Sequence, residues 1–161
     1  MLQAGAGIGA STAKLLGKNG YSVCVNFRNR LDEAQSIVSW INSNGGKAFS
    51  HKADVSNEQE VLSLFEAIDE TFGSITHLVN NAGILLPQMS LLDMTEERIN
   101  KILTTNVTSC FLCSREAIKR MTNGGSIVNV SSGASRSGSS NEYIDYAASK
   151  GAIDTFTKGL A

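Results

Sequence analysis

Apolar residues recur along the chain with two different periods, and the changes of period divide it into predicted helices and strands. Longer segments repeat apolar residues every three or four positions, whereas short runs rich in β-branched and aromatic residues stand between glycine breaks. Alternating strands and helices need right-handed crossovers, which predicts one α/β domain over residues 1–161 with a doubly wound parallel sheet. The predicted helices cover residues 8–19, 31–44, 56–72, 96–121 and 143–161, and the predicted strands cover 21–27, 47–51, 75–80 and 126–132.

Polar residues and glycines mark where the predicted helices begin and end. Ser56 and Gln59 have the spacing of a capping box, and Thr95 is a candidate N-cap for the long helix. Gly45 and Gly73 follow apolar-periodic segments, as glycines that end helices do. Ligands of doubly wound sheets bind beyond the carboxyl ends of the strands, so the residues after each strand are where chemistry is expected.

Composition narrows the function classes. The chain has 161 residues, of which 42% are hydrophobic, enough to form the core of one domain. Fourteen basic and fifteen acidic residues leave a formal net charge of -1, which argues against nucleic acid or an anionic membrane as a partner. No apolar run reaches the roughly 18 residues of a membrane span, and the first residues lack a signal pattern. We therefore expect a soluble, cytoplasmic protein that acts on a small molecule.

The cysteines and histidines indicate neither disulfides nor a metal. Three cysteines are too few, and odd in number, for a disulfide framework, which suits a reducing compartment. Cys110 and Cys113 form a C-x-x-C inside a predicted helix rather than at a strand-to-helix turn, so we interpret them as small core residues. His51 and His77 have no partners at ligand spacing, so we expect packing or surface roles for them and no bound metal.

A glycine-rich segment stands directly before the first predicted helix. Gly5, Gly7, Ile8 and Gly9 form a turn that would let a pyrophosphate approach backbone N–H groups and the positive end of the helix dipole. About 20 residues further on, an NAD site carries a carboxylate for the ribose hydroxyls, whereas this chain has Arg28. Arginine suits a 2′-phosphate, so the sequence favours NADP as cofactor, with NAD as the alternative. An ordinary glycine loop and a solvated surface arginine are the competing interpretations.

A phenol and an ammonium group share one face of the last predicted helix. Tyr146 and Lys150 stand four residues apart. Ser131 and Ser132 end the preceding predicted strand, and the loop between them and the helix returns the chain to the carboxyl edge of the sheet. Tyr143 is a rival to Tyr146, but no lysine stands four residues after it, so we interpret it as a pocket or packing residue.

With these residues in place, nearly the whole chain resembles the short-chain dehydrogenase/reductase family. Asn106 is similar to the family's helix asparagine, and Asp54 with Val55 is similar to its adenine-contacting pair. The resemblance implies a Rossmann-like fold and an NAD(P)-dependent interconversion of a carbonyl compound and a secondary alcohol. Four further signals follow in the family's order: Gly7-Ile8-Gly9, Asn80-Asn81-Ala82-Gly83, Val130-Ser131-Ser132 and Tyr146-x-x-x-Lys150.

The resemblance also implies roles for these residues. Tyr146 would be the general acid/base, trading a proton with the substrate oxygen while hydride passes to or from the nicotinamide. A free phenol titrates near 10, and Lys150 would favour the phenolate and hydrogen-bond the nicotinamide ribose. Ser132, with Ser131 as the alternative, would hold the carbonyl oxygen, and Asn106 would support a proton relay through water. The cofactor would also meet Asn81, Ala82 and Gly83.

The chain departs from the family pattern at both ends. Leu2 and Gln3 stand where the family has Thr-Gly, so the first glycine of the loop is absent and the preceding strand is mostly gone. The last predicted helix is still running at Ala161. Since the first strand is central in the usual order, its shortening would open a gap between its neighbours. We expect an incomplete sheet and a chain that is marginally stable or prone to association.

Three functions fit this sequence. The first is an active NADP-dependent reductase, recorded here as part of a longer polypeptide. The second is a catalytically inactive, shortened family member that binds nucleotide or pairs with a full-length relative. The third is a nucleotide-binding regulator in which Tyr146 and Lys150 are idle. The resemblance implies dimers or tetramers formed through the helices 96–121 and 143–161. The substrate stays open, because segments 85–94 and 133–141 suit several kinds of carbonyl compound equally.

Overall fold

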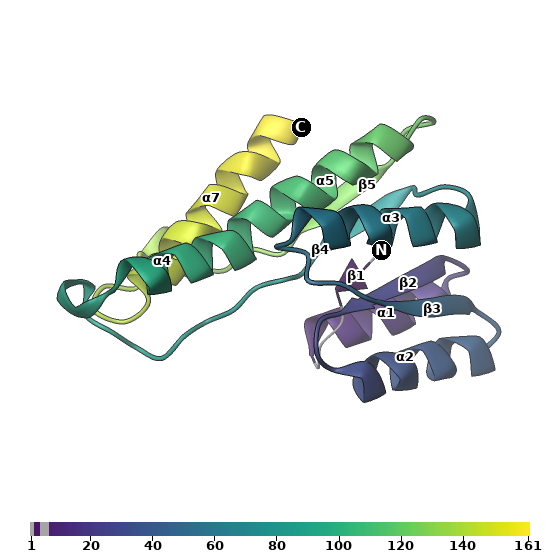
Figure 1. The fold of residues 1–161 in the computed structure, drawn as a ribbon, viewed down its shortest axis with the longest axis horizontal. Helices are drawn as coiled ribbons and strands as arrows, with labels where there is room; N and C mark the ends of the chain where they lie inside the picture. Colours follow the sequence, from purple (N-terminus) through teal and green to yellow (C-terminus); the bar gives the residue numbers. More distant parts are fainter. Residues whose placement is uncertain (1, 4–6) are drawn as a thin grey trace.

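The computed structural model describes residues 2–3 and 7–161, which form a parallel sheet with helices on both faces (Figure 1). The five strands pair in the order β3-β2-β1-β4-β5, and every pairing is parallel. The predicted doubly wound α/β fold is thereby confirmed. The strands are β1 (Leu2–Gln3), β2 (Ser22–Phe27), β3 (Lys47–Lys52), β4 (His77–Asn80) and β5 (Ser126–Asn129).

The helices follow the predicted order with two short additions and one interruption. The 3₁₀ turn η1 lies in the segment 85–94, and a short helix, α6, occupies part of the predicted loop 133–141. The long helix predicted over 96–121 contains a π-helical turn, so it divides into α4, the turn η2 and α5. The elements are α1 (Ile8–Lys18), α2 (Leu31–Ser43), α3 (Glu58–Phe72), η1 (Leu91–Asp93), α4 (Glu96–Leu103), η2 (Thr104–Thr108), α5 (Ser109–Arg120), α6 (Ala134–Ser137) and α7 (Ile144–Leu160).

The cap of α3 differs from the prediction. Asn57, not Ser56, is the N-cap, and its Oδ1 accepts hydrogen bonds from the backbone N–H groups of Gln59 and Glu60 at 3.0 and 3.2 Å. The Ser56 hydroxyl instead donates to Asp54 at 2.6 Å. Asparagine caps a helix at least as well as serine, so the helix begins one residue later than a capping box at Ser56 would require. The predicted cap of α4 is confirmed, since Thr95 accepts from the backbone of Arg98.

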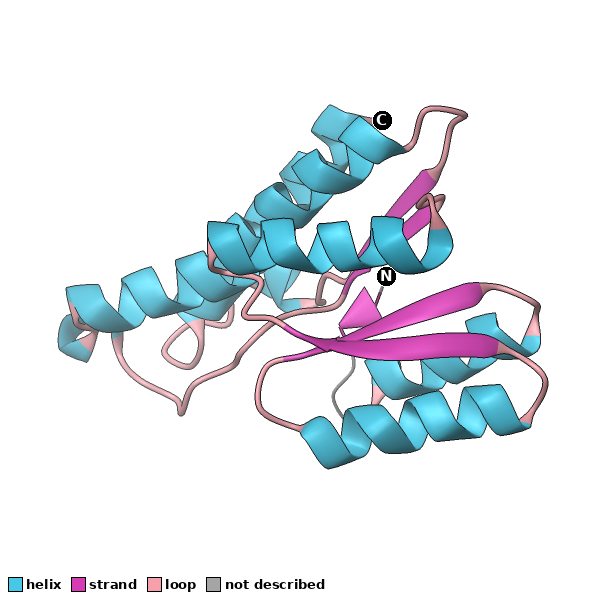
Figure 2. Ribbon diagram, turned by 45° about the vertical axis from the view of Figure 1, so that its right-hand side comes forward, coloured by secondary structure: helices cyan, strands magenta, loops and turns pink. Residues whose placement is uncertain are grey.

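Helices cover both faces of the sheet (Figure 2), and a cluster of buried apolar side chains lies on each face. Val23, Val25 and Phe27 of β2 pack with α1 and α2 on one face. Cys24 points the other way and packs in the cluster formed by α3 and α5. Successive side chains of a strand point to opposite faces, so a strand that is apolar at each position is buried on both. Because Val23, Cys24 and Val25 are buried in succession, β2 is covered on both faces.

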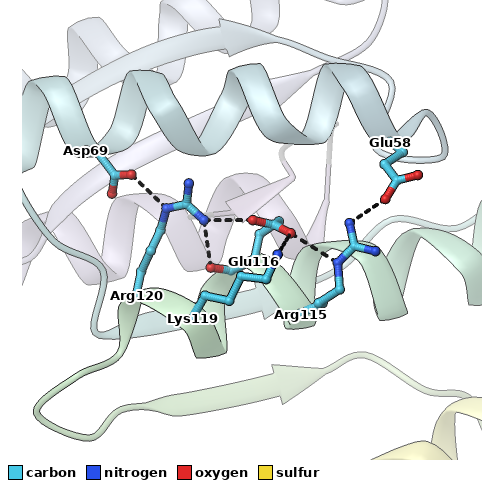
Figure 3. A network of polar contacts seen from close by, with 6 residues as sticks. All are labelled: Glu58, Asp69, Arg115, Glu116, Lys119 and Arg120. Atoms are coloured by element: carbon cyan, nitrogen blue, oxygen red, sulfur yellow. Dashed lines mark hydrogen bonds and ion pairs between the residues drawn. The ribbon is translucent and has the colours of Figure 1, made fainter.

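A network of charges joins α3 to α5 along their outer sides (Figure 3). The side chain of Glu116 is only 2% exposed and accepts hydrogen bonds from Arg115, Lys119 and Arg120. Arg115 also pairs with Glu58 of α3 at 2.6 Å, and Arg120 pairs with Asp69 of α3 at 2.7 Å. The two arginines therefore connect the buried carboxylate of α5 with the neighbouring helix.

The cysteines take the core positions expected of them. Cys24, Cys110 and Cys113 are all buried as free thiols. Burial raises the pKa of Cys24 and Cys113 to about 12 and that of Cys110 to about 11. Thiols with such high pKa values are poor nucleophiles, which agrees with a packing role for the C-x-x-C. No helix in the described ranges 7–161 is long and apolar enough to cross a membrane.

Candidate active site

The predicted phenol and ammonium pair lies on the first half of α7, at the carboxyl edge of β5. Lys150 is 4% exposed, and its Nζ donates a hydrogen bond of 2.7 Å to the carbonyl of Val130, directly after β5. The same Nζ lies 5.7 Å from the ring centroid of the half-buried Tyr146. Anchoring by Val130 therefore fixes a cation beside the phenol ring.

Burial sets the electrostatics of this lysine. It lowers the pKa of Lys150 below its usual range, while the nearby Cys110 and Asp154 act in the opposite direction. An ammonium group with few water molecules around it exerts a stronger field on neighbouring groups than one in bulk solvent. The environment of Lys150 thus differs from that of the exposed Lys158 near the end of the same helix.

Asn106 ties the loop after β4 to α7. It sits in the π-helical turn η2 and is 1% exposed. Its Oδ1 accepts from the backbone N–H of Ile84 at 2.7 Å, while its Nδ2 donates to the Ile84 carbonyl and to Ser149 Oγ, both at 3.0 Å. A π-turn widens a helix locally and is frequent at functional sites. Here it carries Asn106, whose side chain contacts both the loop after β4 and α7.

Gly83 leaves a bare backbone surface beside the lysine. A Cβ at this position would lie 3.4 Å from Lys150 Nζ and 3.6 Å from Asn106 Oδ1. The glycine is exposed, and it follows Asn81 and Ala82 in the loop after β4. A flat ligand can therefore approach Lys150 over this loop without meeting a side chain from residue 83.

The two serines after β5 make different contacts. Ser131 Oγ donates to the backbone carbonyl of Lys150 at 3.4 Å. The hydroxyl of Ser132 accepts from the N–H of Ala134, within the loop that leads to α6. Ser131 is thus turned toward the backbone of α7, whereas Ser132 contacts the segment that follows it, and the choice between the two serines stays a prediction. Tyr143 is half-buried and lies just before α7 begins.

The predicted phosphate site lies at the start of α1. Gly5 is outside the described residues, whereas Gly7, Ile8 and Gly9 form the entry to the helix. Gly7 has a φ of 94°, a conformation that favours glycine. Among the described residues no side chain caps the helix, and its first turn holds no acidic residue, so its N–H groups and its positive dipole end suit an anion.

Arg28 and Asp54 meet at the ends of two adjacent strands. Arg28 follows β2, Asp54 follows β3, and Arg28 Nε lies 3.0 Å from Asp54 Oδ2. The Arg28 side chain is 55% exposed, so it stands in solvent at the edge of the sheet. Val55 is 4% exposed and packs in the core, so any nucleotide contact at this residue falls to its backbone.

A buried ion pair next to Tyr146 was not predicted from the sequence. Arg98 of α4 lies 2.8 Å from Asp145 of α7, and both side chains are less than 10% exposed. Asp145 Oδ1 also accepts from the backbone N–H of Tyr146 at 2.8 Å. The partners are 47 residues apart and each is common on helix surfaces, so no local pattern singled them out. The pair fixes the first turn of α7 against α4.

Known proteins are similar to this chain along nearly its whole length. The sequence profile of the family described as short chain dehydrogenase matches residues 2–161. The uncharacterized oxidoreductase YgfF of Escherichia coli is 54% identical over 160 residues, which are 96% of this chain and 65% of that protein. Versicolorin reductase stcU of Emericella nidulans is 36% identical over 158 residues, which are 98% of this chain and 60% of the reductase.

A solved structure gives the same result for the fold. The crystal structure of a short chain dehydrogenase from Burkholderia cenocepacia in complex with NADP matches with a TM-score of 0.92 at 33% identity. The match covers 99% of this chain and 65% of the other. The chain studied here therefore spans 60% to 65% of the length of these three proteins.

Proposed function

Because the chain belongs to the short-chain dehydrogenase family, we propose that this protein interconverts a carbonyl compound and a secondary alcohol by hydride transfer with NADP(H). The observation that carries the proposal is the pair on α7, with the buried Lys150 Nζ 5.7 Å from the ring of Tyr146. An ammonium group beside a phenol stabilises the negative charge that develops when the phenol gives up its proton. Tyr146 would exchange that proton with the substrate oxygen.

The residues present suit a dinucleotide. The uncapped start of α1, with Gly7 and Gly9, would hold the pyrophosphate, and the bare backbone at Gly83 would leave room for the nicotinamide ribose next to Lys150. When bound, the nicotinamide would supply or accept the hydride. The exposed guanidinium of Arg28, held by Asp54, supports NADP over NAD because a 2′-phosphate is a doubly charged partner for it.

The remaining site residues would position the reacting groups. Ser132 would donate a hydrogen bond to the carbonyl oxygen, and Asn106 would hold the loop after β4 against α7 through its bonds to Ile84 and Ser149. Reduction of a carbonyl leaves negative charge on its oxygen, so a donor and a proton source at one point are what the reaction needs. The segments 85–94 and 133–141 would form the substrate side of the site.

We also propose that the protein associates through α5 and α7. Phe111 and Phe156 pack at 4.1 Å between ring centroids, and Phe111, Ile118 and Leu160 are 51%, 50% and 42% exposed. With Leu112 they line a hollow of about 520 Å³ on the outer side of the two helices. Exposed apolar residues grouped in this way favour a second subunit.

The three free, buried thiols support the cytoplasm as the place of action.

A binding titration followed by a turnover assay tests the proposed activity. Fluorescence titration with NADPH and NADH should give tighter binding of NADPH by the wild-type chain, with binding much weakened in Lys150→Ala. Lys158→Ala, an exposed lysine on the same helix, is the matched control and should bind as the wild type does. Oxidation of NADPH at 340 nm is then followed with aldehydes, ketones and quinones.

The outcomes separate the oxidoreductase from the two hypotheses without catalysis. Turnover that disappears in Tyr146→Phe supports the oxidoreductase. Nucleotide binding without turnover of any carbonyl compound would instead indicate a regulator, or an inactive family member that binds nucleotide, in which the Tyr146 and Lys150 pair is idle. No binding of either nucleotide would make this chain an inactive member of the family.

A further inference from the structure

Three Asn-Gly dipeptides occur in the chain, each at or just after the end of a helix. All three glycines adopt the left-handed conformation, with φ values of 85°, 83° and 81°. Each glycine N–H donates to the carbonyl three residues before it, at 3.1, 3.3 and 3.1 Å. The glycine geometry is thus the same each time, and any difference among the three lies at the asparagine. The dipeptides are Asn19-Gly20 after α1, Asn44-Gly45 after α2 and Asn123-Gly124 after α5.

Two of these asparagines are held by the helix that they end. Asn19 is the C-cap of α1, Asn44 is the C-cap of α2, and the backbone N–H of each donates to helix carbonyls. The side-chain Nδ2 of Asn19 donates to the carbonyl of Leu15 at 2.8 Å. The Nδ2 of Asn44 donates in the same way to the carbonyl of Trp40 at 2.7 Å. Both side-chain amides are therefore turned back toward the last turn of the helix.

Asn123 lacks these contacts. It is exposed and lies two residues beyond Met121, the C-cap of α5, in the turn that joins α5 to β5 (Figure 1). Among residues 2–3 and 7–161, neither its backbone N–H nor its side-chain amide has a hydrogen-bond partner. The bond from Gly124 to Met121 closes the turn, and Ser126 then joins the sheet. The side-chain amide of Asn123 is therefore free to rotate toward the glycine that follows it.

A rotating asparagine amide beside a glycine allows a ring closure within the chain. The backbone nitrogen of Gly124 attacks Cγ of Asn123 and forms a C–N bond, and the side-chain nitrogen leaves as ammonia with the proton of that backbone nitrogen. Water then opens the succinimide ring at either carbonyl, which gives aspartate or isoaspartate. Glycine favours this step because it has no Cβ to shield its nitrogen. At Asn19 and Asn44, the hydrogen bond from Nδ2 to the helix must break first.

We propose that Asn123 is a site of spontaneous modification, at which the side-chain amide closes onto Gly124 and opens to aspartate and isoaspartate. Asn19 and Asn44, which stand in the same dipeptide, are protected by their helices. The reaction needs only water and is independent of the proposed oxidoreductase activity. Modification at this site changes the turn that leads into β5.

The turn has little space for the isoaspartate product, which adds one methylene group to the main chain. A Cβ on Gly125 would lie only 2.6 Å from Met121 Sδ and 2.6 Å from the carbonyl oxygen of Thr76. The N–H of Ser126 donates to the same carbonyl at 2.9 Å, and Ser126 pairs with His77 at the start of β5. A longer backbone at residue 123 should therefore loosen the pairing of β5 with β4 at this end.

The three dipeptides can be compared in a single sample. The 161-residue chain is incubated at pH 8, digested with trypsin and analysed by mass spectrometry, and a sample taken at the start corrects for conversion during digestion. Trypsin separates the sites, because peptides 19–28, 31–47 and 121–136 each contain one dipeptide. Labelling by an isoaspartyl methyltransferase distinguishes isoaspartate from aspartate. The same incubation in concentrated urea, where no helix holds Asn19 or Asn44, is the control.

In the folded chain, Asn123 should convert about threefold to tenfold faster than Asn19 and Asn44, which is the effect of one net hydrogen bond on a rate. In urea the three sites should convert at similar rates. Equal rates in the folded chain would overturn the proposal. A difference that persists unchanged in urea would overturn it too, because neighbouring residues in the sequence would then be its cause.

Hydrogen exchange tests the effect on β5. The isoaspartate form, separated by ion-exchange chromatography, should exchange faster than the unmodified chain over residues 126–129 and equally over β3. Asn123→Asp adds the charge without the extra methylene group, so it is the matched control and should exchange as the wild type does. Equal exchange of the isoaspartate form and Asn123→Asp over residues 126–129 would refute the loosening of β5.

Discussion

Replacing the buried Glu116 with glutamine measures how much the charge network centred on this residue of α5 contributes to the stability of the fold. The carboxylate accepts hydrogen bonds of 2.8 Å from Lys119, 2.8 Å from Arg120 and 3.0 Å from Arg115. Burial by itself raises the pKa of Glu116, but the three cationic partners outweigh it and lower this pKa from 4.5 to about 2. Glutamine preserves the shape of the side chain and leaves the three cations without their shared anion.

The size of the effect follows from the pKa of Glu116. A carboxyl group with a pKa of about 2 in the folded chain, against 4.5 when unfolded, contributes up to about 3 kcal/mol to the free energy of unfolding at neutral pH. Arg115 and Lys119 are 44% and 58% exposed, so water and salt screen part of this contribution. We therefore expect Glu116→Gln to lower the free energy of unfolding by about 2 kcal/mol at pH 7.

The stabilisation by the Glu116 carboxylate should decrease as the pH falls. A lowered pKa means that the stabilisation is fully present above about pH 4.5 and is lost as the pH falls toward about 2. Urea unfolding at pH 7 and pH 3, followed by circular dichroism, should show a large difference between wild type and Glu116→Gln at pH 7 and a smaller one at pH 3. Glu66→Gln, an exposed glutamate on α3, is the matched control. A difference that is below about 0.5 kcal/mol at pH 7, or equal at both pH values, would refute this reasoning.

Three further predictions concern other parts of the molecule. Arg28→Ala should weaken NADPH binding about tenfold and leave NADH binding nearly unchanged, because one charge-assisted contact with the 2′-phosphate is lost; fluorescence titration with both nucleotides checks this. Asp145→Asn should lower the free energy of unfolding by about 3 kcal/mol, since it leaves Arg98 buried without its anion; urea unfolding measures the loss, and a change below about 1 kcal/mol would argue against it. Phe111→Ser should reduce self-association in analytical ultracentrifugation, whereas Leu92→Ser, which alters a residue that is 94% exposed, should not.

Apolar periodicity and glycine breaks predicted the order of the helices and strands, because those signals are local. The β-branched and aromatic residues over 21–27 and the glycine at residue 73 are each signals that act within a few residues of sequence. The cap of α3 was misplaced by one residue for a related reason. Ser56 and Asn57 are both good N-caps, and the choice between them depends on Asp54, whose carboxylate takes the serine hydroxyl.

The features that the sequence did not reveal depend on partners far along the chain. The π-helical turn at Thr104–Thr108 places Asn106 between Ile84 and Ser149, contacts that span 22 and 43 residues. The ion pair of Arg98 with Asp145 spans 47 residues. Helix periodicity says which face a residue occupies but not which distant side chain meets it, so these contacts required the structure. The roles of Ser132, Tyr146, Lys150 and Asn106 stay predictions until the variants are measured.

The three buried thiols give this chain an internal reporter of its own opening. Cys24 lies in β2, while Cys110 and Cys113 lie on the buried side of α5. The three sulfur atoms are therefore distributed between the sheet and a helix that covers it. A water-soluble disulfide reagent can reach none of them while the fold is intact, because each is 3% exposed or less. The rate at which each cysteine becomes labelled therefore measures how often local unfolding exposes it. Mass spectrometry of the three labelled sites would locate these openings without an engineered probe.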